Sequence, residues 1–234
     1  MENQNKTPYL NQGKNKERTN CVAVDESDLM RTNKFNEEYD KSSDKSSDDR
    51  ILTAGPYVDE KEVEYVMDAV KNGWNENWNK YLVKFENTFK SYLGRDFALA
   101  TSSCTGALHL ALAALGIGKG DEVILPDMSW IATAAAVVYV GAEPVFVDID
   151  PKSWTMDPES LKKAITPRTK AIMPVHLYGH PCEMDKIMDI AKENDLFVVE
   201  DAAPSIGAEF KGKRTGSFGD FAAFSFQGAK LLVT

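Results

Sequence analysis

The sequence predicts an α/β protein built on a mainly parallel sheet with helices on both faces. Two observations carry this prediction. From residue 51 onward, short apolar runs alternate with longer segments in which apolar residues recur at helical spacing. The short runs are apolar throughout, as is typical of strands that are covered on both faces.

Two helices are predicted at the start of this region, and each ends at a glycine, which favours a helix terminus. The first lies within residues 55–73 and closes on Gly73, and the second covers residues 80–94 and closes on Gly94. Their apolar residues at helical spacing are Val63, Val66, Met67 and Val70 in the first, and Leu82, Phe85, Phe89 and Tyr92 in the second.

Six short apolar runs follow and are the predicted strands. They are FALATS (97–102), EVILPD (122–127), PVFVDID (144–150), KAIMPVHLY (170–178), LFVVEDA (196–202) and FAAFSF (221–226). Helices are predicted between several of them, at residues 106–118, 131–142 and 184–195. Ligands of such sheets bind at the carboxyl ends of the strands, so the loops after the strands are where a site is expected.

The first 50 residues differ in composition from the rest of the chain. They hold few apolar residues and include the near-repeat DKSSDKSSDDR. Such a segment cannot bury enough surface to offset its ordering entropy, so residues 1–50 are predicted to be a disordered leader. The alternative is an arm that packs on a partner subunit. Residues 51–234 are predicted to form one domain, and a chain that starts near Ile51 is expected to fold.

Composition excludes several classes of partner. The net charge of -9 and the pI near 4.9 disfavour nucleic acid, and the N-terminus lacks the apolar stretch of a secretory signal. No apolar run reaches the length of about 18 residues that a membrane span needs. A cytoplasmic protein with no membrane partner is therefore expected. The three cysteines form no CxxC pair, and Asp148 and Asp150 have no further ligands nearby, so no metal is expected.

The loop TSSCTG, before the predicted helix at 106–118, is a candidate phosphate site. Ser103, Cys104 and Thr105 lie where a predicted strand ends and a helix begins. Free backbone N–H groups and the positive end of the helix dipole favour an anion there. The alternative is that a hydroxyl merely caps the helix.

Three further residues are candidates for cofactor chemistry, and each has an ordinary alternative. Asp201 ends an apolar strand and could pair with a protonated pyridine nitrogen, or it could cap the next helical turn. Trp130 could lie against an aromatic ring or belong to the core. Lys230 follows a strand and a short turn and could form a Schiff base, or it could be a surface lysine.

In combination, these segments resemble the DegT/DnrJ/EryC1/StrS family of sugar nucleotide aminotransferases, which are fold-type I pyridoxal-phosphate enzymes. The resemblance runs from about Thr53 to Thr234. Its most distinctive blocks are SSCTGALHLALAALGIGKGDEVILPDMSWIATAAAV, GAEPVFVDIDP, PVHLYGHPCEMD, VVEDAAPSIGAEFKGKRTGSFGD and AAFSFQGAK.

The resemblance implies a role for each candidate residue. Lys230 is the implied Schiff-base lysine, Asp201 the partner of the pyridine nitrogen and Trp130 the aromatic residue on the cofactor ring. The implied phosphate contacts are Ser103, Cys104, Thr105 and Ser225. This chain departs from the family at Cys104, where many relatives have glycine, and at Pro204, where relatives often have Gln, His or Glu.

The resemblance also implies the reaction. An amino donor, probably glutamate, passes its nitrogen to pyridoxal 5′-phosphate, and a nucleotide-linked keto sugar takes it up. Relatives with a dehydrase activity carry His in place of the lysine, so Lys230 favours amino transfer. Family members form homodimers and continue into a small C-terminal domain, which this chain is expected to lack. The alternative function is therefore a catalytically silent fragment that binds the cofactor or a full-length partner subunit.

Overall fold

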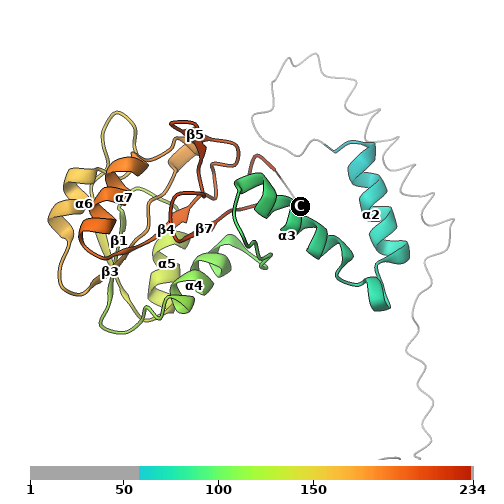
Figure 1. Cartoon of the computed structure of the whole chain (residues 1–234), viewed down its shortest axis with the longest axis horizontal. Coiled ribbons are helices and arrows are strands. Elements are labelled where there is room, and N and C mark those ends of the chain that lie inside the picture. The colour runs from blue at the N-terminus through green and yellow to red at the C-terminus, as the bar shows by residue number, and fades with distance from the viewer. Residues whose placement is uncertain (1–57, 233–234) are drawn as a thin grey trace, which may run out of the picture. The chain divides into compact units, whose positions relative to one another are not determined.

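The computed structural model describes residues 58–232 of the 234-residue chain (Figure 1). The predicted leader at residues 1–50 lies outside the described residues, so its disorder and its boundary stay predictions. The described part is built around a five-stranded sheet in the order β2-β1-β3-β4-β7, in which every neighbouring pair is parallel. The strands are β1 (Glu122–Pro126), β2 (Glu143–Val147), β3 (Thr169–Ile172), β4 (Phe197–Asp201) and β7 (Phe221–Ala223).

Two helices pack on each face of the sheet. Helices α4 (Cys104–Ala114) and α5 (Ile131–Tyr139) share one core cluster, and α6 (Pro158–Ala164) and α7 (Met184–Glu193) share the other. Successive strand residues point to opposite faces, so in β4 Val199 joins the α4/α5 cluster and Val198 the α6/α7 cluster. Both faces are thus apolar, which confirms the predicted fold class.

The residues at the start of helix α6 explain why a helix begins there, although this helix was not predicted from the sequence. The Asp157 side chain caps the helix by accepting hydrogen bonds from Glu159 N and Ser160 N, at 3.2 and 3.1 Å. Pro158 occupies the first turn, where a missing N–H costs nothing. The signal was therefore present in the sequence as an Asp-Pro pair.

The predicted N-terminal helices are α2 (Glu60–Asn72) and α3 (Lys80–Leu93), and a 3-10 turn, η1 (Asn75–Asn77), lies between them. Asp59 and Glu62 form a capping box at the start of α2. Gly94 ends α3 with a φ of 67°, a left-handed conformation that glycine adopts without strain. Val63, Val66 and Val70, on the apolar stripe of α2, are each more than half exposed.

The segment that continues β7 packs on α3 through alternate residues. The Phe224 ring lies 4.9 Å from the Phe89 ring, and the Phe226 ring lies 5.1 Å from Phe85 and 5.5 Å from Phe89. Ser225, between the two phenylalanines, is buried, with 8% of its surface exposed. Because neighbours on an extended chain point in opposite directions, Ser225 faces away from α3.

One predicted strand is wrong. Residues 97–101 of the FALATS run form no strand, and Phe97 and Leu99 are 90% and 68% exposed. A strand needs a neighbour to complete its backbone hydrogen bonds, and the described residues supply only the Glu86 carboxylate, which accepts from Ala100 N at 2.9 Å. Apolar composition alone therefore did not determine this segment.

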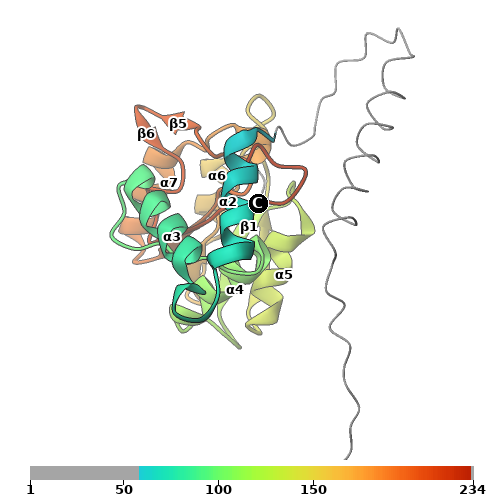
Figure 2. The ribbon, with the colours of Figure 1, turned by 90° about the vertical axis from the view of Figure 1, so that its right-hand side faces the viewer.

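The sequence analysis also missed a hairpin, which Figure 2 shows beside α7. Strands β5 (Glu209–Phe210) and β6 (Lys213–Arg214) pair antiparallel around a turn in which Lys211 and Gly212 both have positive φ. In residues 58–232, no helix is both long and apolar enough to cross a membrane.

Candidate active site

The predicted site residues lie at the carboxyl ends of strands and at the starts of helices. Asp201 is the last residue of β4, and Ser103 and Trp130 directly precede α4 and α5. Ser225 follows β7, and Lys230 lies one turn further along, where its backbone N donates to Gln227 O at 2.8 Å. Parallel strands end at one edge of a sheet, so this placement follows from the topology.

Asp201 is a buried carboxylate with 5% of its surface exposed. Its Oδ2 atom accepts a hydrogen bond from Thr133 Oγ1 of α5 at 2.7 Å, and its Oδ1 atom accepts from Ala203 N at 3.2 Å. Burial raises the pKa of Asp201 above its usual value, although the two hydrogen bonds and the charge of Lys230 oppose the rise. A nearby cation would therefore stabilise its ionised form.

The charges of Lys230 and Asp201 act on the titration of neighbouring groups. The positive charge of Lys230 lowers the pKa of both Asp201 and Cys104. Burial, followed by the charge of Asp201, raises the pKa of the Cys104 thiol to about 12, so the thiol is neutral at physiological pH. The structure thus brings together one residue from the start of α4, one from the end of β4 and one from the turn after β7.

The loop before α4 has the geometry of a capped helix start. Ser103 Oγ accepts from Gly106 N at 3.0 Å, so the capping alternative holds for this hydroxyl. The first backbone N–H groups of a helix have no partner within it, and this cap satisfies only the one of Gly106. The N–H groups of Cys104 and Thr105 belong to the same first turn and are candidates for binding an anion.

Trp130 is not a core residue, because 78% of its surface is exposed. It directly precedes α5, the helix that carries Thr133. Ser225 contacts its own turn weakly, through Gln227 N at 3.5 Å. The structure therefore leaves the indole exposed, and it buries the Ser225 hydroxyl near the end of β7.

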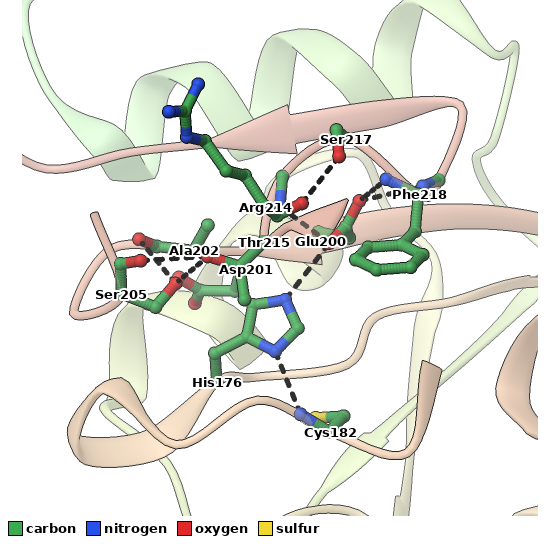
Figure 3. Close-up of polar contacts among 12 residues, drawn as sticks. His176, Cys182, Glu200, Asp201, Ala202, Ser205, Arg214, Thr215, Ser217 and Phe218 are labelled. Carbon is green, nitrogen blue, oxygen red and sulfur yellow. Dashed lines mark hydrogen bonds and ion pairs between the residues drawn. The ribbon is translucent and has the colours of Figure 1, made fainter. Parts of the chain in front are cut away.

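The sequence analysis missed a buried network around Glu200, which Figure 3 shows. His176 and Glu200 are both fully buried, and Nε2 of His176 lies 3.0 Å from Oε2 of Glu200. The His176 Nδ1 atom accepts from Cys182 N at 3.1 Å, so the imidazole proton is on Nε2 and is donated to Glu200.

Glu200 is held in its ionised form by its hydrogen bonds. Its carboxylate also accepts from the backbone N–H groups of Gly216, Phe218 and Gly219, each at 2.7 Å. Although burial opposes it, the hydrogen bond from His176 and these backbone donors hold the pKa of Glu200 below its usual value. The sequence signal was a second carboxylate beside Asp201 in an apolar strand.

The site has the groups that a ligand with a phosphate, a cationic ring nitrogen and an electrophilic carbon would need. Free N–H groups start α4, a buried carboxylate ends β4, and an amine lies near that carboxylate. Among residues 58–232 there is no group of three His, Cys, Asp or Glu side chains placed to hold a metal ion.

Several known proteins are similar to this chain. The chain is 49% identical over 185 residues to a GDP-perosamine synthase of Caulobacter vibrioides, a match that covers 79% of this chain and 50% of the relative. It is 56% identical over 131 residues to a UDP-N-acetyl-3-dehydro-alpha-D-glucosamine 3-aminotransferase of Acidithiobacillus ferrooxidans, covering 56% of this chain and 36% of that protein.

A solved structure is similar as well. The putative sugar aminotransferase Spr1654 from Streptococcus pneumoniae, in its PLP form, is 34% identical with a TM-score of 0.72, and the match covers 78% of this chain and 50% of that one. The chain spans about half the length of the curated relatives it matches. The family model for DegT/DnrJ/EryC1/StrS aminotransferases matches residues 56–234, and the chain therefore belongs to this family.

Proposed function

We propose that this chain is the cofactor-binding part of a pyridoxal-5′-phosphate aminotransferase that acts on a nucleotide-linked keto sugar. The observation that carries the proposal is the buried Asp201 carboxylate at the end of β4, held by Thr133 of α5, with the turn that carries Lys230 following the parallel neighbour β7. The relatives named as GDP-perosamine synthase and as a UDP-sugar aminotransferase support the sugar substrate, and the PLP form of the Streptococcus pneumoniae protein supports the cofactor.

The described residues fit this cofactor. Asp201 is buried with a raised pKa, so it lacks the full charge compensation that a protonated ring nitrogen would supply. Lys230 provides an amine near it, and the first turn of α4 provides free N–H groups for a phosphate. Pyridoxal phosphate, when bound, supplies the electron-accepting ring that makes amino transfer possible.

The proposed roles of the side chains are those that the family resemblance implies. Asp201 keeps the ring nitrogen charged, and Lys230 holds the cofactor and then moves a proton at the reacting carbon through its Nζ atom. Ser103, Cys104, Thr105 and Ser225 bind the phosphate through N–H groups and hydroxyls. Trp130 covers one face of the ring, which its exposure leaves open to contact.

The remaining parts of the proposal concern the whole protein. Glutamate is the proposed amino donor, a homodimer the proposed assembly and the cytoplasm the proposed location. Relatives extend well beyond the matched region, so further residues are expected to complete the substrate site.

The experiment that tests the proposal is trapping of the cofactor. The full chain is titrated with pyridoxal phosphate, reduced with borohydride, digested and mapped by mass spectrometry. Labelling concentrated on Lys230 supports the site, whereas labelling spread over surface lysines contradicts it. Loss of the visible absorption band on adding glutamate supports amino transfer. Labelling of Lys230 without a glutamate response supports the alternative of a silent fragment that binds the cofactor.

Phosphate binding at the start of α4 is expected to depend on Thr105 more than on the Cys104 thiol. Thr105→Val removes a hydroxyl donor and should weaken pyridoxal phosphate by about 10-fold, the effect of one hydrogen bond to a charged group. Cys104→Ser keeps the small size and adds a donor, so its affinity should stay within about 3-fold of the original. Both are measured by absorbance titration. A greater loss in Cys104→Ser would show that the neutral thiol has its own role.

A further inference from the structure

We infer that Glu200 is a positioning residue, which fixes the chain segment that carries Ser225 and Lys230 relative to Asp201. Glu200 is not itself placed at the cofactor, because its side chain points to the α6/α7 face of β4 and that of Asp201 to the α4/α5 face. The inference rests on the proposed function for the roles of Ser225 and Lys230. The positioning itself is a property of the fold and can be tested without the cofactor.

The Glu200 carboxylate is saturated with hydrogen bonds. Oε2 accepts from His176 Nε2 and Gly216 N, and Oε1 accepts from Phe218 N and Gly219 N. Four donors on two oxygens use the four acceptor positions of a carboxylate. A neutral amide at this position would present its own N–H groups to some of these donors, so only an ionised carboxylate satisfies the loop at residues 216–219.

A cation holds the same loop through its carbonyl groups. Arg95, just after α3, donates from Nη2 to Gly219 O and Asp220 O, both at 2.9 Å, and from Nη1 to Ser217 O at 3.3 Å. Glu200 therefore satisfies the donors of the loop and Arg95 its acceptors. A cavity of about 630 Å³ lies beside Arg95.

The loop transmits this constraint to the site through packing and register. Gly216 has a φ of +82°, and a Cβ atom there would lie 2.1 Å from the Phe224 ring, so the loop backbone rests directly on Phe224. Phe224 is the residue before Ser225. In the adjoining strands Asp201 pairs with Ala223, and Ala202 N donates to Ala223 O at 2.9 Å. The loop that Glu200 holds therefore also fixes the position of Ser225, along the direction of the strands, relative to Asp201.

The adjacent residues Glu200 and Asp201 thus act on the two sides of one strand. Glu200 fixes the position of residues 221–230, which carry Lys230, relative to β4. Asp201 presents the carboxylate proposed to pair with the ring nitrogen. His176 supports Glu200 by donating its Nε2 proton, and its own Nδ1 is fixed by Cys182 N. The side chains of neighbouring residues in a strand point to opposite faces of the sheet, so the positions of Glu200 and Asp201 relative to each other are fixed by the strand itself.

The test is amide hydrogen exchange of the full chain with Glu200→Gln. Exchange in residues 216–219 and also in residues 221–230 is expected to become at least about 10-fold faster, because the loop loses charge-assisted hydrogen bonds. The matched control is Glu122→Gln, which alters another buried carboxylate at the opposite end of the sheet, held by Thr166, Thr169 and Arg168. This control should leave residues 221–230 at the original rate.

Arg95→Met keeps the test informative if Glu200→Gln does not fold, since it releases the same loop from its carbonyl side. It should accelerate exchange in residues 221–230 in the same direction. Unchanged exchange in residues 221–230, with only residues 216–219 accelerated, would overturn the inference. Equal acceleration in Glu122→Gln would overturn it too, because the effect would then be general loss of stability.

Labelling of Lys230 with pyridoxal phosphate and borohydride separates this inference from the proposed function. If borohydride labels Lys230 in the original chain, Glu200→Gln should lower the rate of Lys230 labelling by about 10-fold, and Glu122→Gln should not. A labelling rate equal to the original in Glu200→Gln would contradict the positioning role. If the original chain is not labelled at Lys230, the proposed function fails for this chain, while the exchange result still decides whether Glu200 positions the segment.

Discussion

Lys230→Ala is expected to abolish covalent attachment of pyridoxal phosphate. Lys230 is the lysine whose charge lowers the pKa of Asp201 and the one proposed to bind the cofactor, so the visible absorption of the bound cofactor and the borohydride label should both disappear. The measurement is an absorbance titration followed by peptide mapping. Lys119→Ala, which removes an exposed lysine in the turn beyond the C-terminal end of α4, is the matched control and should retain the full signal.

Lys230→Arg separates the amine from its charge. Arginine keeps the positive charge near Asp201 but cannot form the covalent bond. Lys230→Arg should therefore not be labelled, and in this it should resemble Lys230→Ala. Only Lys230→Ala should raise the pKa of Asp201 further, because the charge of Lys230 lowers that pKa and arginine keeps the charge. A covalent label that persists in either variant would show that another lysine holds the cofactor.

Asp201→Asn is expected to weaken pyridoxal phosphate by at least about 100-fold, since removing one partner of a buried ion pair costs about 3–5 kcal/mol. The affinity is measured by absorbance titration at neutral pH. Thr133→Val is the companion variant, because it removes the 2.7 Å hydrogen bond to Asp201 but keeps the carboxylate. A smaller loss, of about 10-fold, is expected there. Equal affinity of Asp201→Asn and the original chain would show that Asp201 has no ring partner.

Asp201→Asn should also make the cofactor-free chain more stable at neutral pH. Burial raises the folded-state pKa of Asp201 above the ordinary aspartate value of 3.8, so the folded chain holds the proton more tightly than the unfolded chain does. The contribution of Asp201 to the free energy of unfolding is therefore full below pH 3.8 and is lost as the pH rises through the raised value. Urea unfolding should show the advantage of Asp201→Asn growing over this range, and an advantage independent of pH would contradict the assignment.

Much of the fold could be predicted because its signals are local. Gly73 and Gly94 end their helices as the sequence indicated, and the apolar runs around Ile124 and Val198 became strands buried on both faces. The edge at which Asp201 lies also followed, because parallel strands share their carboxyl ends, but the strand predicted before Ser103 did not form.

The remaining features depend on contacts between distant segments. The FALATS run has strand composition but no strand partner among residues 58–232. Asp201 received a partner, Thr133, from a helix far away in the chain, and no spacing in the sequence indicates that hydrogen bond. Glu200 was overlooked because its donors are backbone N–H groups, which every residue but proline has and which therefore leave no mark in the sequence.

The saturated Glu200 also has a consequence for the order in which the site is assembled during synthesis. Chains leave the ribosome N-terminus first, so Glu200 emerges before the loop at residues 216–219 that supplies three of its donors. Until that loop arrives, the α6/α7 side of β4 holds a carboxylate without its backbone donors, and β7 emerges only after the loop. The turn that carries Lys230 emerges later still. We therefore expect the nascent chain to form the start of α4 and the Asp201 end of the site first, and to close the site with the lysine last.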